Sequence, residues 1–63
     1  MAISLKAARI NAGKTQEEVG KHAGKSKMTI RSYESYKSTP DIETAIKIAE
    51  FYGMNVDDIA WTK

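Results

Sequence analysis

The 63-residue sequence contains no cysteine, one proline and a single histidine, and each scarcity excludes something. Without cysteine, neither a disulfide framework nor a thiolate metal site is available to stabilise so short a chain. Stability must then come from helix packing or self-association. With only His22 and no glycine-rich phosphate loop, the sequence offers no catalytic constellation and no metal site. We therefore expect no enzyme, no cofactor and no small-molecule ligand.

Long apolar runs are also missing. The opening MAISLKAARI has too few consecutive apolar residues for a secretory signal, and no window approaches the roughly 20 apolar residues of a membrane span. Residues 1–63 are enough for one domain, which at this size buries only about 60% of the surface that the unfolded chain exposes. The sequence therefore predicts a soluble, cytoplasmic domain with a small core and no membrane partner.

Acidic residues are scarce in one half of the chain. Residues 1–40 carry eight lysines and arginines against three acids, whereas residues 41–63 carry two against five. Between Glu18 and Glu34 there are four cations and no acid. This asymmetry suggests a polyanion partner for the N-terminal side. A solvated lysine face has the same composition, so the positions of the charges must decide between the two interpretations.

Alternating runs of β-branched residues are absent, so no strands are predicted. Five helices are predicted instead, and the fold class is all-α. Their ranges are about 4–12, 16–23, 26–35, 41–52 and 55–61. Ser4, Thr15, Ser26 and Asp41 are typical N-cap residues, and Thr15 with Glu18 has the form of a capping box.

The second and third predicted helices are separated by only about three residues. Helices joined so closely cross steeply, as in a helix-turn-helix. Gly20 costs roughly 1 kcal/mol relative to alanine inside a helix, and the close passage of the third helix over it would explain its presence. Gly24 suits a left-handed residue in the turn.

The third helix has two different faces on a helical wheel at 100° per residue. It packs through Ile30 and Tyr33. Its outward face contains no acid and consists of Lys27, Met28, Arg31, Ser32 and Ser35. In the major groove of DNA, lysine can donate to guanine and an apolar side chain can meet a thymine methyl. The alternative is that Met28 folds back onto the core edge and the lysines are merely solvated.

The segment LKAARINAGKTQEEVGKHAGKSKMTIRSYE, followed by Pro40 and IAEFYGMNVDDI, resembles the lambda-repressor and Cro type of helix-turn-helix regulators of phages and bacteria. The resemblance covers residues 5–60. It is carried by Gln16, Val19, Gly20, Ala23, Gly24, Ile30 and Tyr33. It implies a compact five-helix, lambda-repressor-like domain that binds double-stranded DNA, acts as a repressor and commonly pairs into a two-fold dimer.

The resemblance also implies which residues contact DNA. They are Gln16, Ser26, Lys27, Met28, Thr29, Arg31, Ser32, Lys37 and Ser38. Lys27, Met28 and Ser32 would face base edges, and Arg31 would reach a base or a phosphate. The others would contact the phosphate backbone, with Gln16 at the N-terminus of its helix, where an anion is favoured.

Other positions match the family in structure or depart from it. Arg9 and Glu34 match an ion pair that ties the first helix to the third. Lys25 replaces an apolar turn residue, so that the turn packs less tightly or the lysine stem covers it. Tyr36 replaces a glycine where positive φ is needed, which suggests that this loop takes another path and weakens the inference for Lys37 and Ser38.

Two questions remain open at the level of the sequence. The rival to DNA binding is a protein-interaction module of the same fold, such as an antirepressor or an antitoxin-like subunit. For a homodimer, Trp61 in the C-terminal region is the best interface candidate, with Ile46 and Phe51 next, whereas Met54, Val56 and Ile59 are expected to complete the core. The chain would be either a whole Cro-like regulator or the DNA-binding part of a longer protein.

Overall fold

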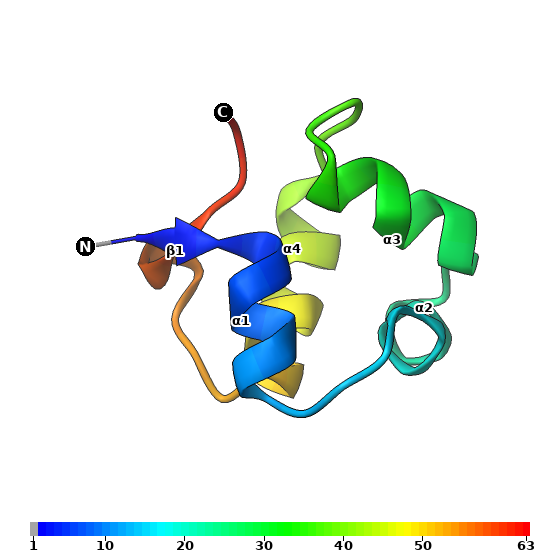
Figure 1. Ribbon diagram of the computed structural model, residues 1–63, viewed down its shortest axis with the longest axis horizontal. Coiled ribbons are helices and arrows are strands. Elements are labelled where there is room, and N and C mark those ends of the chain that lie inside the picture. Colours follow the sequence, from blue (N-terminus) through cyan, green and yellow to red (C-terminus); the bar gives the residue numbers. More distant parts are fainter. Residues whose placement is uncertain (1) are drawn as a thin grey trace.

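Four α-helices make up most of the structure, a computed structural model that describes residues 2–63 (Figure 1). They are α1 (Leu5–Asn11), α2 (Gln16–Ala23), α3 (Lys27–Glu34) and α4 (Ile42–Phe51). The remaining elements are β1 (Ile3–Ser4), the 3-10 turn η1 (Val56–Asp58) and β2 (Ile59–Ala60). The domain measures 28 × 22 × 20 Å, which confirms the prediction of a small helical domain. None of the described helices has the length and apolar character needed to cross a membrane.

The C-terminal segment differs from the prediction. A fifth α-helix over 55–61 is not found, because residues 56–58 form a single 3-10 turn. The expectation of no strands is wrong, since β2 pairs with β1 in parallel, with Ile3 opposite Ile59 and Ser4 opposite Ala60. An α-helix over residues 55–61 would be too short to be stable by itself. The extended conformation instead buries Ile59, which is 3% exposed, and satisfies backbone groups at both ends of the chain.

The four α-helices begin where their predicted caps lie. The side chains of Ser4, Thr15, Ser26 and Asp41 each accept a hydrogen bond from the backbone N–H three residues later. Thr15 and Glu18 form the complete capping box, with Glu18 Oε1 2.8 Å from the Thr15 backbone nitrogen. These bonds satisfy donors that a helix N-terminus otherwise leaves free.

Two of the capping carboxylates predict how stability depends on pH. Hydrogen bonds from Thr15 lower the pKa of Glu18, and hydrogen bonds from Thr44 lower the pKa of Asp41. A lowered folded-state pKa adds stability above the unfolded-state pKa, and that stability is lost as the pH falls toward the folded-state value. We expect the urea midpoint to decrease as the pH is lowered below about 4.5, where these carboxyl groups begin to take up protons in the unfolded chain.

Glu18→Gln and Asp41→Asn keep a capping side chain but remove the titration. Each should therefore flatten the fall in urea midpoint between about pH 4.5 and pH 2.5. Glu50→Gln is the control, because Glu50 lies exposed in the last turn of α4. If the dependence of the urea midpoint on pH changed equally in all three variants, the two capping carboxylates would not be the origin of the acid sensitivity.

The core lies where the helices converge. The largest fully buried side chains are Leu5, Val19, Ile30 and Ile48, one from each α-helix. Partly buried Met54 and Val56 pack against this cluster, and Ile59 belongs to it, as predicted. The core therefore holds all four helices, together with the C-terminal segment, in one unit.

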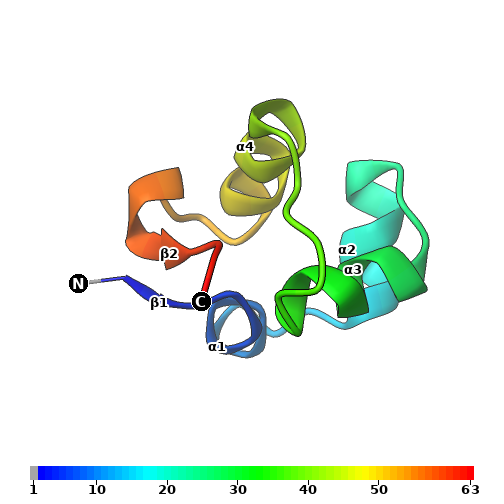
Figure 2. The same cartoon turned by 90° about the horizontal axis from the view of Figure 1, so that it is seen from above.

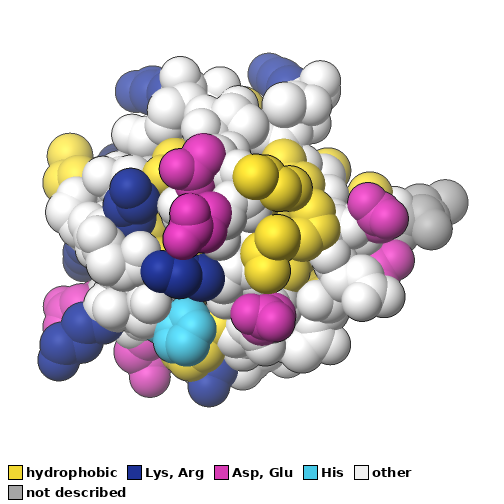
Figure 3. Space-filling view, turned by 180° about the vertical axis from the view of Figure 1, so that it is seen from behind, with side chains coloured by type: hydrophobic (Ala, Val, Ile, Leu, Met, Phe, Trp, Pro, Cys, Tyr) yellow, Lys and Arg dark blue, Asp and Glu magenta, His cyan; other side chains and the backbone are white. Residues whose placement is uncertain are grey.

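The helices are not arranged symmetrically around the core. Seen from above, α4 lies on one side of the molecule, and α1 and α3 lie on the opposite side (Figure 2). The face seen from behind carries a group of hydrophobic side chains near its centre (Figure 3). Ile42 and Ile46 of α4 are 69% and 42% exposed, so the apolar stripe of α4 is wider than the core that it covers.

Candidate nucleic-acid interface

Gly20 fixes the way in which α2 approaches the turn before α3. A Cβ atom at this position would lie 2.7 Å from the Lys25 carbonyl oxygen and 3.3 Å from the Ser26 carbonyl carbon. Gly24 ends α2 with a φ of 71°, the left-handed conformation predicted for it. The predicted close approach is confirmed, but the backbone that passes over Gly20 belongs to the turn and not to α3. The Lys25 side chain is exposed.

The outward face of α3 is free of acidic side chains. Ile30 and Tyr33 are buried, as predicted. Lys27 and Arg31 are exposed, and Met28 is 68% exposed. The alternative in which Met28 folds back onto the core is therefore wrong. Ser32 is half-buried in α3, and Ser35, the C-cap residue after the helix, is exposed.

The hydroxyl groups at the start of α3 hydrogen-bond to each other. Ser26 Oγ accepts the Thr29 backbone N–H at 3.1 Å and lies 3.0 Å from Thr29 Oγ1. Both are accessible, with Ser26 exposed and Thr29 half-buried. A hydroxyl has one donor and two acceptor sites, so the pair keeps capacity for a further hydrogen bond while it caps the helix.

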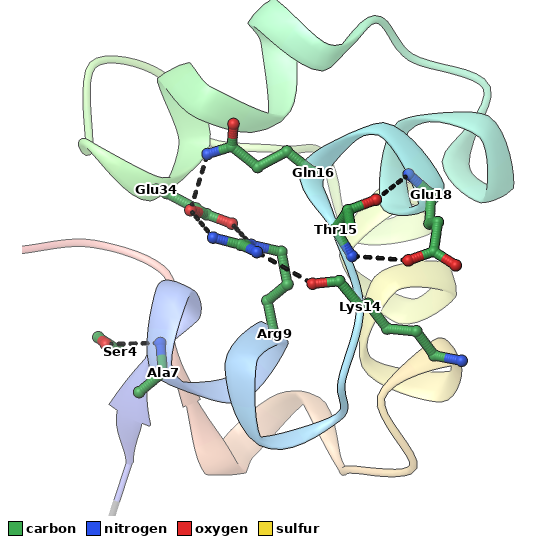
Figure 4. Close-up of polar contacts among 8 residues, drawn as sticks. All are labelled: Ser4, Ala7, Arg9, Lys14, Thr15, Gln16, Glu18 and Glu34. Carbon is green, nitrogen blue, oxygen red and sulfur yellow. Dashed lines mark hydrogen bonds and ion pairs between the residues drawn. The ribbon is translucent and has the colours of Figure 1, made fainter.

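The predicted ion pair between α1 and α3 is present and gains a third member (Figure 4). Arg9 Nε lies 2.6 Å from Glu34 Oε2, and Arg9 Nη2 donates to Glu34 Oε1 at 3.3 Å. The hydrogen bond with Glu34 raises the pKa of Arg9. Arg9 Nη1 also donates to the Lys14 carbonyl oxygen at 2.9 Å, which holds the segment between α1 and α2.

Gln16 joins this network from the first turn of α2. Its Nε2 donates to Glu34 Oε1 at 3.1 Å. An amide group has two N–H donors, so one remains for a phosphate when the other is held by Glu34. The sequence placed Gln16 at a phosphate but did not foresee that Glu34 would orient it.

Sequence reasoning missed Lys6. Two neighbouring surface hollows lie between α1, α2 and α3, and Lys6 and Gln16 line both. Lys27 and Arg9 line one of them, and Arg31 lines the other. Lys6 lies three residues before Arg9, hence on the same side of α1, and that spacing was the available signal. Each hollow also has one acid in its lining, Glu17 in the first and Glu34 in the second, but cations outnumber acids in both. The basic surface therefore extends from α3 onto α1.

The loop after α3 follows the path expected for a glycine, contrary to the prediction. Tyr36 has a φ of 62° and is the one non-glycine residue with positive φ among residues 2–63. Its half-buried ring sends the hydroxyl to the Ala60 carbonyl oxygen at 3.4 Å. The left-handed conformation costs a non-glycine residue roughly 1–2 kcal/mol, and these contacts of the ring offset part of it.

Because the loop keeps this path, Lys37 and Ser38 lie beside the end of α3. Their backbone N–H groups donate to the Ser32 carbonyl oxygen at 3.0 and 3.5 Å, and both side chains are exposed. The loop therefore presents a lysine and a serine next to Ser32, the last of the predicted base-facing residues.

The remaining aromatic residues and His22 are used in packing. The Trp61 indole is partly buried against the core, and its Nε1 donates to the Val56 carbonyl oxygen at 2.9 Å. The His22 ring stacks on Phe51 at 4.2 Å, and Lys14 Nζ lies 4.6 Å from the centre of the same Phe51 ring. No cluster of three potential metal ligands occurs in residues 2–63.

Comparison with known proteins agrees with this geometry. A family model described as helix-turn-helix matches residues 5–59. An uncharacterized HTH-type transcriptional regulator of Methanocaldococcus jannaschii is 42% identical over 45 residues, which cover 71% of this chain and 68% of that protein. A second one, of Bacillus subtilis, is 28% identical over 61 residues, or 97% and 92% of the two chains. Neither is named as an enzyme. No solved structure matches.

Proposed function

The chain belongs to the helix-turn-helix family, and we propose that it is a cytoplasmic transcriptional regulator that binds double-stranded DNA. The observation that carries the proposal is the exposed, acid-free face of α3, on which Met28 lies beside Lys27 and Arg31. An α-helix fits the major groove of B-DNA. A large apolar side chain that is 68% exposed gains from contact with a thymine methyl group.

The interface divides into residues that read bases and residues that hold phosphates. Lys27, Met28 and Ser32 would face base edges, and Arg31 would reach a base or a phosphate. Around them, the phosphate contacts would come from Lys6, Gln16, Ser26, Thr29, Lys37 and Ser38. Phosphate contacts set the register of the protein on the duplex and base contacts select the sequence, so this arrangement suits sequence-specific binding. The family resemblance supports a repressor of the Cro type, as in phages.

A two-fold dimer on a palindromic operator belongs to the same proposal. One domain covers one half-site, and pairing two copies doubles the contact area. Trp61 remains the proposed contact, through the part of its ring that is not buried in its own chain. A footprint with two equal halves about one helical turn apart would support it, and a single half-site footprint would contradict it.

The salt dependence of DNA binding tests the proposal. The dissociation constant for a duplex of about 20 base pairs should be measured by fluorescence anisotropy between about 50 and 200 mM salt. With Lys6 and Lys37 on phosphates, together with Arg31 when it reaches one, the log–log slope should be about −2 to −3. Lys6→Gln should make this slope shallower by about 1.

Lys47→Gln is the matched control, because Lys47 is an exposed lysine on α4, on the far side from α1 and α3. It should leave the slope within error of the parent value. Absent binding, or a slope near zero in the parent protein, would contradict the proposal and favour the protein-interaction module.

A further inference from the structure

Met28 lies at the centre of the outward face of α3. The opposite face of the helix is buried through Ile30 and Tyr33. At about 100° per residue, the direction opposite the midpoint of these two side chains falls about 10° from Met28, with Arg31 and Ser32 on either side of it. Met28 also belongs to the first turn of α3, and the N-terminal residues of a recognition helix are those that reach base edges. A helix that enters a groove with this face forward therefore brings the Met28 side chain to the bases.

The charges around Met28 indicate which kind of partner covers it. The side chain is 68% exposed, and Lys27 and Arg31 are exposed cations on the same acid-free face. An apolar protein surface packed on Met28 would cover these cations without a counter-charge, which costs free energy. The phosphates that border the major groove supply that counter-charge. A duplex is therefore the partner that suits both the methionine and its charged neighbours.

The chemistry of methionine limits what Met28 can recognise on a base. Its thioether has no hydrogen-bond donor and only a weak acceptor. The apolar group that base edges present in the major groove is the C5 methyl group of thymine. 5-Methylcytosine carries a methyl group on the same ring carbon, where cytosine has a hydrogen atom. Cytosine is otherwise recognised through its N4 donor by a carboxylate, which the outward face of α3 does not contain.

We infer that Met28 makes DNA binding depend on the C5 methyl group of one pyrimidine, so that methylation of a cytosine at this position strengthens binding. The inference rests on the proposed function and adds a response to DNA methylation to it. The pyrimidine is thymine or 5-methylcytosine, and unmodified cytosine binds more weakly. One buried methyl group corresponds to an affinity difference of about fourfold.

The first test removes the methyl group from the DNA. A bound sequence is selected from a random pool of duplexes of about 20 base pairs, and each of its thymines is replaced in turn by deoxyuridine. Deoxyuridine lacks the C5 methyl group but keeps every hydrogen-bonding group of thymine. Fluorescence anisotropy at one fixed salt concentration should show binding about fourfold weaker when the thymine that Met28 faces is replaced.

The second test adds a methyl group to cytosine. A cytosine–guanine pair is placed at the position that responds to deoxyuridine, with the cytosine either unmodified or methylated at C5. The two duplexes have the same base pairs and the same charge, so they differ only in the methyl group. The methylated duplex should bind about fourfold more tightly.

Variants of the protein assign the methyl dependence to Met28. Met28→Ala and Met28→Gln should abolish it, because neither presents a large apolar side chain, whereas Met28→Leu should retain it. Because Met28 is exposed, all three variants should keep the parent's urea midpoint. Ile42→Ala is the matched control, since Ile42 is 69% exposed on α4, which lies across the molecule from α3. It should keep the full methyl dependence.

The failure of this inference can be distinguished from the failure of the proposed function. Sequence-selective binding in which every deoxyuridine replacement is neutral would overturn the inference and leave the proposed function standing. A methyl dependence that persists in Met28→Ala would do the same. If no duplex binds at all, both the inference and the proposed function are wrong.

Discussion

Glu34→Ala is expected to lower the free energy of unfolding by about 3–5 kcal/mol. The carboxylate accepts hydrogen bonds from Arg9 and Gln16, and the side chains of Arg9 and Glu34 are only 13% and 5% exposed. Removing it leaves a largely buried guanidinium without its counter-charge. Proteins gain only about 0.05–0.15 kcal/mol of stability per residue. A large fraction of this variant should therefore be unfolded at 25 °C.

Urea unfolding followed by circular dichroism measures this effect. Glu17→Ala removes an exposed acid from the same region and should change stability by less than about 0.5 kcal/mol. The double variant Arg9→Ala, Glu34→Ala should cost less than the two single changes together, because neither charge is then left alone. If the Glu34→Ala protein had the parent's urea midpoint, the network of Arg9, Gln16 and Glu34 would contribute nothing to stability.

Gly20→Val should lower stability by about 2–3 kcal/mol or more. Its Cβ would meet the Lys25 carbonyl oxygen at 2.7 Å, and this oxygen is backbone that cannot rotate away. The turn before α3 would have to move, and α3 would move with it. Valine is otherwise a better helix residue than glycine, so a loss of stability has to come from the close approach.

Lys21→Val is the matched control for Gly20→Val. It places the same β-branched side chain one position further along α2, where the parent residue is exposed. Its effect should stay within about 0.5 kcal/mol. Equal losses of stability in the two variants would mean that helix propensity, and not contact with the turn, explains the effect of replacing Gly20.

The helix positions could be predicted because their signals are local. Ser4, Thr15, Ser26 and Asp41 each bond to a backbone N–H three residues away, so each cap is set by a few adjacent residues. The outward face of α3 followed from helical periodicity, and the steep crossing of α2 and α3 followed from the short segment that joins them.

The features that were missed depend on contacts between distant segments. The β1–β2 pair joins the two ends of the chain and replaces the predicted fifth helix, and no local pattern in four residues signals it. The positive φ of Tyr36 is supported by a hydrogen bond to Ala60, 24 residues away. Lys6 belongs to the candidate interface because α1 packs against α3 and lines the same hollows as α2. The spacing within α1 indicates on which side of that helix Lys6 lies, but not that this side faces α2 and α3.

Amide NMR spectra recorded while a DNA duplex is added show which surface of the protein contacts DNA. We expect shifts in residues 26–32, 37 and 38 and near Lys6 and Gln16, with small changes at Ile46 and Lys47 on the far side. At low salt, a duplex of any sequence suffices for the phosphate contacts. Shifts centred on α4, or spectra that do not change at all, would contradict a DNA-binding surface built on α3.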